Sequence, residues 1–493
     1  NVGFMVAYFS TRASVIDSKP RTLYASQMKP DALINMERIK RRQMIKMLGA
    51  TSLGIASSSF FKLDASSQKN FNKEETYCDI LVVGGGTSGV IAAIQSARLG
   101  QKTILMESGS QLGGTLTTGG VSFPGIFHAW GKQIISGIGW ELVRECVALN
   151  GDVLPDFSVV PDNKTIRHWR HQIPLNSALY VLLAEEKCID AGVNVRYYES
   201  PVSVAFTKNR WTVISSGKGT NTIINCSQII DCTGNASVVA MAGHTVVRDT
   251  EVQPGSLIFT LDGYDFENLN LSEIPEKFHG LLRQNMFINS EKNNAPNNFP
   301  LTVPYNYVYV SGADSTNSET HTNANIQGRK ELLKLLREIK TYPGCQNIRI
   351  SGLKTETAIR ETYRISGLYE VTRDDYINGV SFNDAISYSF YPIDLHRNGK
   401  TIHQEYLKEG VVAQIPLRSL IPQNSNNLIV AGRCLSSDRM ANSALRVQAS
   451  CMGMGQAAAV TVSIANRMGV SPKDVPVAEV KKELIKNGAI VPQ

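Results

Sequence analysis

The chain has 493 residues, of which 42% are hydrophobic and 19% are charged, a composition typical of a globular protein large enough for two or three lobes. Its net charge of +7 is confined to residues 1–70, which hold 11 Lys and Arg against 4 Asp and Glu, so the remainder is balanced at 39 of each. Because this remainder carries no basic excess, the composition gives no support to nucleic-acid binding.

The basic N-terminal segment has the features of an export leader. Within residues 36–65, Arg41 and Arg42 are followed after two apolar residues by Lys46 and then by a mildly apolar stretch, 47–61. This pattern resembles a twin-arginine signal and predicts a periplasmic or secreted protein. The stretch contains glycines and several serines, so it does not predict a stable membrane span. A disordered basic segment on a cytoplasmic protein is the alternative.

The first predicted element of the folded part is a strand–turn–helix unit. An apolar run at 80–83 is followed by Gly84, Gly86 and Gly89 in the spacing Gly-x-Gly-x-x-Gly, and a helical pattern extends over 90–99. The first glycine allows a tight turn, the second lets a pyrophosphate approach the backbone, and the third lets the helix pack closely on the strand. The residues between them, Thr87 and Ser88, open the helix, whose free N–H groups attract phosphate.

A second predicted strand, 102–106, ends at Glu107. At this position a carboxylate accepts hydrogen bonds from the hydroxyls of a ribose. The strand, the glycines, the helix and the acidic residue together predict dinucleotide binding. A glycine-rich turn without a ligand is the alternative.

The next segment favours FAD over NAD. Gly113, Gly114 and Thr115 follow Glu107 after five residues, and this arrangement resembles the glutathione-reductase-like superfamily of FAD proteins. The longer run 113–121 resembles one branch, the FAD-dependent oxidoreductases related to the heterodisulfide-reductase flavin subunit. The resemblance implies that this loop lines the flavin cleft.

Further segments carry the resemblance to about residue 460. Residues 228–236 resemble a strand and turn that return to the cofactor, 359–367 resemble an Arg-Glu-Thr-Arg-Arg-Ile block of the branch, and 428–434 with 453–458 resemble its C-terminal FAD block. Tyr363 stands where the family more often has arginine. The resemblance implies that FAD contacts Val202, Thr233, Gly234, Gly432, Arg433, Gly453, Gly455, Gln456 and Ala457.

The resemblance also raises the question of an iron–sulfur cluster, since relatives of that flavin subunit often carry one. The 8 cysteines include no Cys-x-x-Cys pair, whereas such clusters need closely grouped thiolates. The cysteine spacing therefore does not support an iron–sulfur cluster. His168 and His171 have a metal-like spacing but no acidic or thiol partner nearby, so we predict no metal site.

The remaining elements in chain order predict an α/β fold. Helices are expected at 140–149, 177–191, 327–340 and 444–466, and strands at 193–198, 201–206, 211–215, 222–232 (as a pair) and 305–309. We expect a leader and linker (1–75), a Rossmann-like FAD-binding lobe with a parallel sheet and a β-meander (76–254), an inserted α+β substrate lobe (255–412), and the C-terminal part of the FAD-binding lobe (413–493). Only one Gly-x-Gly-x-x-Gly motif follows a strand, so the sequence does not predict a separate NAD(P) domain. The electron acceptor or donor is therefore expected to be external.

Four residues are candidates for the chemistry. His128 follows the Gly-Gly-Thr loop, and His396 lies in a segment that resembles the substrate lobe of the family, so either is a candidate proton acceptor or substrate ligand. Arg360 and Arg364 have helical spacing and are candidates to bind a substrate carboxylate or the flavin. The alternatives are a loop histidine bonded to the backbone and a structural ion pair with Glu356 or Glu361.

The resemblance implies an FAD-dependent oxidoreductase that transfers hydride between flavin and a polar small molecule with a hydroxyl, an amine or an unsaturated group. Two other functions stay open at this point: a flavin-containing electron-transfer subunit of a redox complex, and a flavin- or ligand-binding protein without catalysis. No Gly-x-Ser-x-Gly elbow is present, so hydrolysis has no support.

Overall fold

The computed structural model describes residues 73–158, 171–284, 305–397 and 402–493. Residues 70–493 form one compact unit. The predicted leader lies outside the described residues. Among the described helices, none has both the length and the apolar character needed to span a bilayer.

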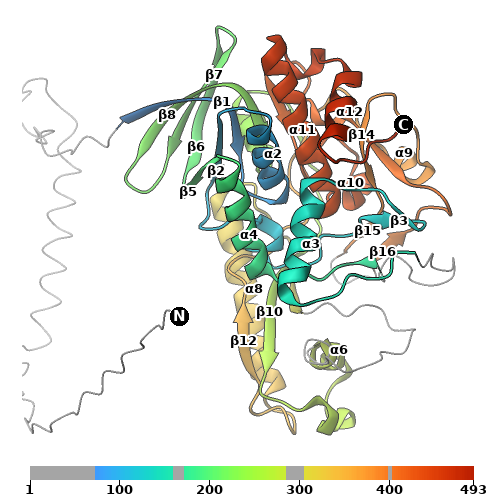
Figure 1. Ribbon diagram of the computed structural model, residues 1–493. Helices are drawn as coiled ribbons and strands as arrows, with labels where there is room; N and C mark the ends of the chain where they lie inside the picture. Colours follow the sequence, from blue (N-terminus) through green and yellow to red (C-terminus); the bar gives the residue numbers. More distant parts are fainter. Residues whose placement is uncertain (1–72, 159–170, 285–304, 398–401) are drawn as a thin grey trace, which may run out of the picture. The chain divides into compact units, whose positions relative to one another are not determined.

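The main sheet has seven strands in the order β5-β2-β1-β8-β7-β6, with β18 beside β8 (Figure 1). Its strands are β1 (Lys73–Val83), β2 (Thr103–Glu107), β5 (Asn194–Tyr197), β6 (Ser200–Thr207), β7 (Arg210–Ser216), β8 (Asn221–Asp231) and β18 (Leu428–Val430). Strands β5, β2, β1, β8 and β18 are parallel, and β6 and β7 form an antiparallel meander. The predicted α/β class with a parallel sheet is therefore confirmed.

Tertiary pairing changes two of the predicted strands. β1 begins at Lys73, well before the apolar run, because its polar first half pairs with β8. The predicted strand pair at 222–232 is the single strand β8, whose first half contacts β7 and whose second half contacts β18. A strand with partners on both sides is fixed by backbone hydrogen bonds even where its side chains are polar.

Helices cover the sheet and join it to the C-terminal part of the chain. They are α2 (Thr87–Arg98), α3 (Ile138–Asn150), α4 (Ser177–Asp190), α5 (Ser237–Met241), α10 (Arg439–Leu445), α11 (Gln448–Met468) and α12 (Val477–Lys486). Helix α11 is buried along most of its length because it packs against α2 on one side and contacts β14 on another. The predicted single helix at 444–466 is therefore two helices, α10 and α11, which are separated at Arg446 and Val447.

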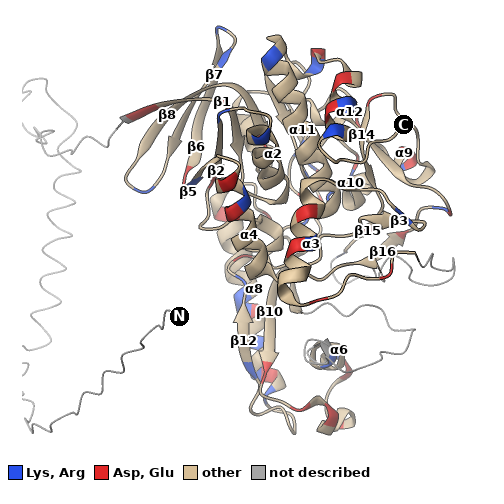
Figure 2. Ribbon diagram, in the orientation of Figure 1, with Lys and Arg blue, Asp and Glu red and all other residues tan. Residues whose placement is uncertain are grey.

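A second, smaller layer extends away from the main sheet (Figure 1). It consists of the sheet β11-β10-β12 (Asn306–Val310, Gly255–Asp262 and Arg349–Leu353), of α6 (Glu276–Gln284) and of the long helix α8 (Ser318–Ile339), which Asn317 caps. Leu257, Phe259 and Leu332 belong to its own hydrophobic core. Charged residues of both signs are interspersed along α8 and α12 (Figure 2).

The segment 373–416, which follows this layer in the chain, packs against the main part of the molecule. It contains α9 (Arg373–Asn378) and the short pairs β14 (Ala385–Ser389) with β17 (Ala413–Pro416) and β15 (Ile393–Leu395) with β16 (His403–Glu405). Two further pairs are β3 (His128–Ala129) with β4 (Lys132–Gln133) and β9 (Val246–Val247) with β13 (Arg364–Ile365). Tyr376 and Ile386 share one core with α2 and α11, although they lie inside the predicted 255–412 lobe. The lobe boundaries remain predictions.

Candidate cofactor and substrate site

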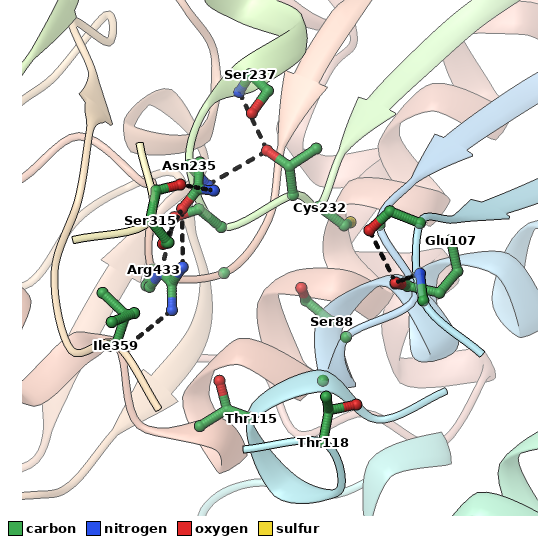
Figure 3. A pocket seen from close by; sticks show the side chains of 18 of the residues that line it. Ser88, Glu107, Thr115, Thr118, Cys232, Asn235, Ser237, Ser315, Ile359 and Arg433 are labelled. Carbon is green, nitrogen blue, oxygen red and sulfur yellow. Dashed lines mark hydrogen bonds between the residues drawn. The ribbon is translucent and has the colours of Figure 1, made fainter. Parts of the chain in front are cut away.

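A cavity of about 420 Å³ opens at the carboxyl ends of the parallel strands. Val83, Glu107, Cys232 and Gly432, each at or just beyond the end of one of these strands, line it. In parallel α/β sheets, ligands bind at this edge. Several of the predicted cofactor residues line the same cavity (Figure 3): Gly84, Gly86, Thr87, Ser88, Glu107, Gly114, Thr115, Thr233, Gly234, Gly432 and Arg433.

The three motif glycines have three different surroundings. Gly84 has φ +100°, and a Cβ there would lie 2.5 Å from the carbonyl oxygen of Cys232. A Cβ on Gly89 would lie 1.8 Å from the carbonyl oxygen of Gly84, so α2 could not sit as close to the strand with any other residue. Gly86 lines the cavity, and a Cβ there would meet nothing within 4 Å. The bare backbone at Gly86 therefore leaves room for a ligand that approaches the start of α2.

Glu107 connects the glycine turn after β1 with the turn after β2. Its carboxylate accepts hydrogen bonds from the backbone N–H groups of Gly85 at 2.7 Å and Gly109 at 2.6 Å. Glu107 also lines the cavity (Figure 3). A carboxylate held in this way presents its oxygens at a fixed place, as recognition of a ribose diol requires.

The turn after β8 is held by one buried carboxylate. Asp231 accepts hydrogen bonds from the Thr233 N–H at 3.0 Å, from the Thr233 hydroxyl at 2.7 Å and from the N–H groups of Val238 and Val239. Burial raises the pKa of this carboxyl, and the four hydrogen bonds act in the opposite direction. The network holds Thr233 and Gly234 at the cavity wall.

Arg433 joins two segments of the wall (Figure 3). Its guanidinium donates to the carbonyl oxygen of Gly234 at 2.7 Å, to the carbonyl oxygen of Ile359 at 2.8 Å and to the side-chain oxygen of Asn235 at 2.9 Å. Burial lowers the pKa of Arg433. The geometry therefore gives Arg433 a role in holding the wall together, and its charge lies beside the cavity.

Among the cavity residues that were not predicted, Arg446 and Gln448 carry polar atoms without a partner. The Arg446 Nε and the Gln448 Oε1 are buried, and neither has a hydrogen-bond partner among the described residues. The Gln448 side-chain amide donates to the carbonyl oxygen of Val121 at 2.8 Å, which fixes its orientation. The free Gln448 acceptor suits an N–H group of a bound ring such as the flavin, and the Arg446 Nε is a free donor for another ligand group. The sequence signal was a lone Arg-Val-Gln between runs of small residues.

A hydrogen-bonded chain of side chains lies next to Arg446. The Nε2 atom of His396 is hydrogen-bonded to the Asp394 carboxylate at 2.9 Å, and its Nδ1 atom is hydrogen-bonded to the Tyr309 hydroxyl at 3.0 Å. Burial lowers the pKa of His396, and the positive charges of Arg360 and Arg446 act in the same direction, which outweighs the opposite effect of Asp394. His396 is therefore neutral at pH 7. Burial raises the pKa of Asp394, but the interactions with His396, Arg446 and Gln404 together outweigh it and hold the pKa below its usual value.

The structure brings Arg360 to the same place. Its guanidinium lies 5.6 Å from the centre of the Tyr309 ring, donates to the Ser256 hydroxyl at 3.0 Å and also bonds the carbonyl oxygen of Pro254. Burial lowers its pKa. The helical spacing expected for Arg360 and Arg364 is wrong, because residues 360–363 have no regular structure and Arg364 begins β13.

None of the four predicted catalytic residues is among those that line the cavity: His396 and Arg360 interact with the wall residue Arg446, and the other two have different neighbours. His128 stacks on Phe157 with 3.7 Å between ring centroids, and burial lowers its pKa to about 4. Neither it nor Arg364 lines the cavity. Arg364 forms an ion pair with Asp249 at 2.8 Å, a different partner from the two expected. A loop histidine packed among aromatic rings and a structural arginine account for both positions.

Several predicted cofactor residues also lie outside the cavity wall. Val202 is 58% exposed on β6, and its neighbour Pro201 lines the cavity in its place. Gly113 caps the short turn of Gly114–Leu116 with φ +99°. The four residues expected on α11 pack against other elements and do not line the cavity: Gly453, Gly455, Gln456 and Ala457. Gly455, for example, faces the backbone of Ser88, and Gln456 donates to Gln95.

Metal ligands are not grouped in the part of the chain that the structure describes, where no set of three or more His, Cys, Asp and Glu comes together. The 8 cysteines are all buried and free. His168 lies outside the described residues, and His171 contacts the ring of Phe157.

Two solved structures show a limited similarity to this chain. The geranylgeranyl bacteriochlorophyll reductase-like protein of Thermoplasma acidophilum shares 14% identity, with 84% of each chain covered and a TM-score of 0.40. The p-nitrophenol 4-monooxygenase of Pseudomonas putida shares 12% identity, with 82% of this chain and 83% of that chain covered and a TM-score of 0.40.

Two curated relatives match shorter stretches. The mitochondrial dihydrolipoyl dehydrogenase of Caenorhabditis elegans is 40% identical over 65 residues, which are 13% of this chain and 12% of the relative. The thiamine thiazole synthase of Archaeoglobus fulgidus is 27% identical over 188 residues, which are 35% of this chain and 63% of the relative. The chain thus spans less than two thirds of the length of either relative.

A family model covers most of the chain. Residues 79–484 match the family described as FAD dependent oxidoreductase, and this range includes the glycine motif, Glu107 and the whole cavity wall. The open backbone at Gly86 and the unpartnered Oε1 atom of Gln448 fit a bound FAD. The chain belongs to the FAD-dependent oxidoreductase family.

Proposed function

We propose that this oxidoreductase transfers hydride between flavin and a polar small molecule that carries a hydroxyl, an amine or an unsaturated group. The observation that carries the proposal is the Tyr309–His396–Asp394 chain beside Arg446, a residue of the cavity wall. Hydride transfer from a C–H bond requires a group that accepts the hydroxyl or amine proton. A neutral histidine with a carboxylate behind it is such a group.

The chain's own residues would hold the cofactor along the cavity. Gly84, Gly86 and the start of α2 suit the pyrophosphate, Glu107 suits the ribose, and Gln448 suits the flavin ring. When bound, FAD supplies the hydride acceptor or donor. The guanidinium of Arg446 adds a positive charge that favours a developing negative charge nearby.

The proton path follows from the two hydrogen bonds of His396. With its Nε2–H donated to Asp394, the Nδ1 atom accepts the hydrogen bond from the Tyr309 hydroxyl. A substrate proton that reaches the Tyr309 oxygen displaces the Tyr309 proton onto Nδ1. Asp394 then stabilises the resulting imidazolium. The reverse path returns the proton when the substrate is reduced.

The proposal is tested by His396→Asn, with His244→Asn, in the turn after α5, as the control. Because burial lowers the pKa of His396, the neutral form is present in the wild type at pH 6.5 and above, and kcat falls only below that pH. His396→Asn should retain FAD, remove this acidic limb and lower kcat about 10²- to 10⁴-fold. Anaerobic bleaching of the flavin by hydroxy acids, sugars and amines measures both effects.

Wild-type bleaching rates in His396→Asn would refute this proton path. A protein that holds FAD but is reduced by none of these compounds would instead favour a flavin-binding protein without catalysis. Tyr309→Phe supplies a second variant, because it removes one hydroxyl and leaves the aromatic packing in place.

We also propose that the chain lies near the branch related to the heterodisulfide-reductase flavin subunit. The segments 113–121 and 359–365 support this relationship. It would imply an external electron partner for the small-molecule reaction. An iron assay on the purified protein tests the electron-transfer alternative, since iron in proportion to flavin would favour a subunit of a redox complex.

A further inference from the structure

Two arginines next to the cavity, like Arg433 in its wall, lack the carboxylate partner that other arginines of the same part of the chain have. Arg364, Arg418 and Arg439 each have a carboxylate partner, at 2.8, 3.0 and 2.9 Å respectively. Arg360 and Arg446 form no ion pair with any residue that the structure describes. Arg360 bonds only neutral oxygens, and Arg446 has only two long contacts of 3.5 Å with one buried Nε atom unpartnered.

Both guanidinium groups contact one short segment of the chain, 253–256. Arg446 contacts the side-chain oxygen of Gln253, and Arg360 bonds Pro254 and Ser256. Gln253 is fixed in turn by Glu361, which accepts its side-chain N–H at 3.0 Å. The two positive charges are therefore close together, and the charge of Arg446 adds to burial in lowering the pKa of Arg360.

The surrounding groups do not neutralise the two arginines. Glu361 is paired with Arg439, so that pair contributes no net charge. Asp394 interacts electrostatically with both, but its oxygens are hydrogen-bonded by His396 at 2.9 Å and Gln404 at 3.2 Å. With His396 neutral, the cluster of Arg360, Arg446, His396 and Asp394 carries one excess positive charge. A buried charge without a partner is costly unless an incoming ion compensates it.

We propose that the substrate is a small carboxylic acid and that Arg446 and Arg360 bind its carboxylate. This inference rests on the proposed hydride transfer and specifies its substrate class. Planar guanidinium groups bind a carboxylate through paired N–H donors, and the Arg446 Nε is free to serve as one of them. Since the Arg360 guanidinium lies 5.6 Å from the centre of the Tyr309 ring, an acid bound by Arg360 lies close to Tyr309.

The position of Tyr309 further restricts the proposed class of substrate. The reacting hydroxyl or amine belongs on a carbon close to the carboxylate, as in a 2-hydroxy or 2-amino acid. In the oxidation, this carbon gives its hydride to the flavin and the heteroatom gives its proton to the Tyr309–His396 pair, so the substrate loses two hydrogens and the flavin is reduced. A sugar or an uncharged alcohol would leave the excess charge uncompensated.

The test measures binding rather than turnover. FAD-loaded protein is titrated with oxalate and benzoate, and with the neutral amides oxamide and benzamide, by calorimetry and by the shift of the flavin absorbance. The variants are Arg446→Gln, Arg360→Gln and Arg446→Lys, and Arg349→Gln is the matched control because its side chain is 73% exposed in an ion pair with Asp262. Flavin content and the unfolding temperature are recorded for each variant.

We expect the carboxylates to bind the wild type and the Arg349→Gln control at least about 10-fold more tightly than their amides. Each Arg→Gln change at 446 or 360 should weaken carboxylate binding about 10- to 100-fold, as loss of a charged hydrogen-bond donor does, with partial recovery in Arg446→Lys. These results with normal flavin content would support the inference even if His396→Asn showed that the proton path is wrong.

Three results would overturn the inference. Equal binding of acids and amides would mean that no anion site exists. Loss of flavin in folded Arg→Gln variants would assign the charges to the cofactor. Inorganic phosphate that binds more tightly than either carboxylate would assign the pair to a phosphate ester.

Discussion

At the scale of single residues, Glu107 combines a structural and a binding task. Its carboxylate satisfies two backbone N–H groups and also lines the cavity. Glu107→Ala should weaken FAD binding about 10- to 100-fold, because the turn loses its acceptor and the ribose hydroxyls lose theirs. Flavin retained after gel filtration, and the dissociation constant of FAD for reconstituted protein, measure the effect.

The control for this change is Glu141→Ala, which removes an exposed carboxylate paired with Arg98 on the surface. This variant should retain flavin as the wild type does. Wild-type FAD affinity in Glu107→Ala would show that the ribose lies elsewhere.

Residue type and spacing identified both candidate histidines but did not distinguish their roles. His128 and His396 both lie in aromatic-rich segments, and nothing in the sequence separates their roles. In the fold, His128 packs against Phe157 and Trp140, whereas His396 meets Asp394 and Tyr309. Asp394 is two residues away and could be noticed in the sequence, but Tyr309 comes from a strand 87 residues earlier.

At the scale of elements, the contact between α2 and α11 depends on one glycine. A Cβ on Gly455 would lie 2.3 Å from the carbonyl oxygen of Ser88, in the backbone of α2. Gly455→Ala should therefore separate the helices and destabilise the protein by about 1–3 kcal/mol despite the better helix propensity of alanine. Chemical denaturation of the purified variant measures the loss.

Gly453→Ala is the matched comparison on the same helix. A Cβ there would lie 2.3 Å from the Ser387 hydroxyl oxygen, which is the end of a side chain that rotates. This change should cost little or stabilise the helix slightly. If both variants were equally stable, the close approach of α2 to α11 would not limit the fold.

The same contact explains why the α11 glycines were expected at the cofactor. A glycine inside a helix indicates a close neighbour but not which neighbour it is. The helix α11 reaches the cavity through its first turn, at Gln448 and Cys451, and Gly453, Gly455, Gln456 and Ala457 face other elements.

At the scale of the whole molecule, we propose that the basic leader directs export of the folded protein. The basic excess of the chain lies within residues 1–70, and Arg41 with Arg42 forms the central feature of the signal. Changing both to lysine keeps the charge but removes the guanidinium pair that a receptor reads. Fractionation of bacterial cells that express the full chain should find the wild type outside the cytoplasm and the double lysine variant inside it.

Arg38→Lys, outside the pair, should be exported normally. An exported double lysine variant, or a wild type that stays in the cytoplasm, would contradict the twin-arginine proposal. Flavin in the exported wild type would indicate that FAD is loaded before export.

The sequence alone determined what depends on contiguous residues. The strand, the glycine turn, the start of α2 and Glu107 are within 30 residues of one another, so local sterics and backbone hydrogen bonding fix them, and they predicted dinucleotide binding. The family resemblance of the next segment, 113–121, predicted FAD. The tertiary structure decided which distant side chains meet. Arg360, Arg446, Tyr309 and His396 come from separate elements, and their charges matter only because the fold buries them together without enough carboxylates to balance them.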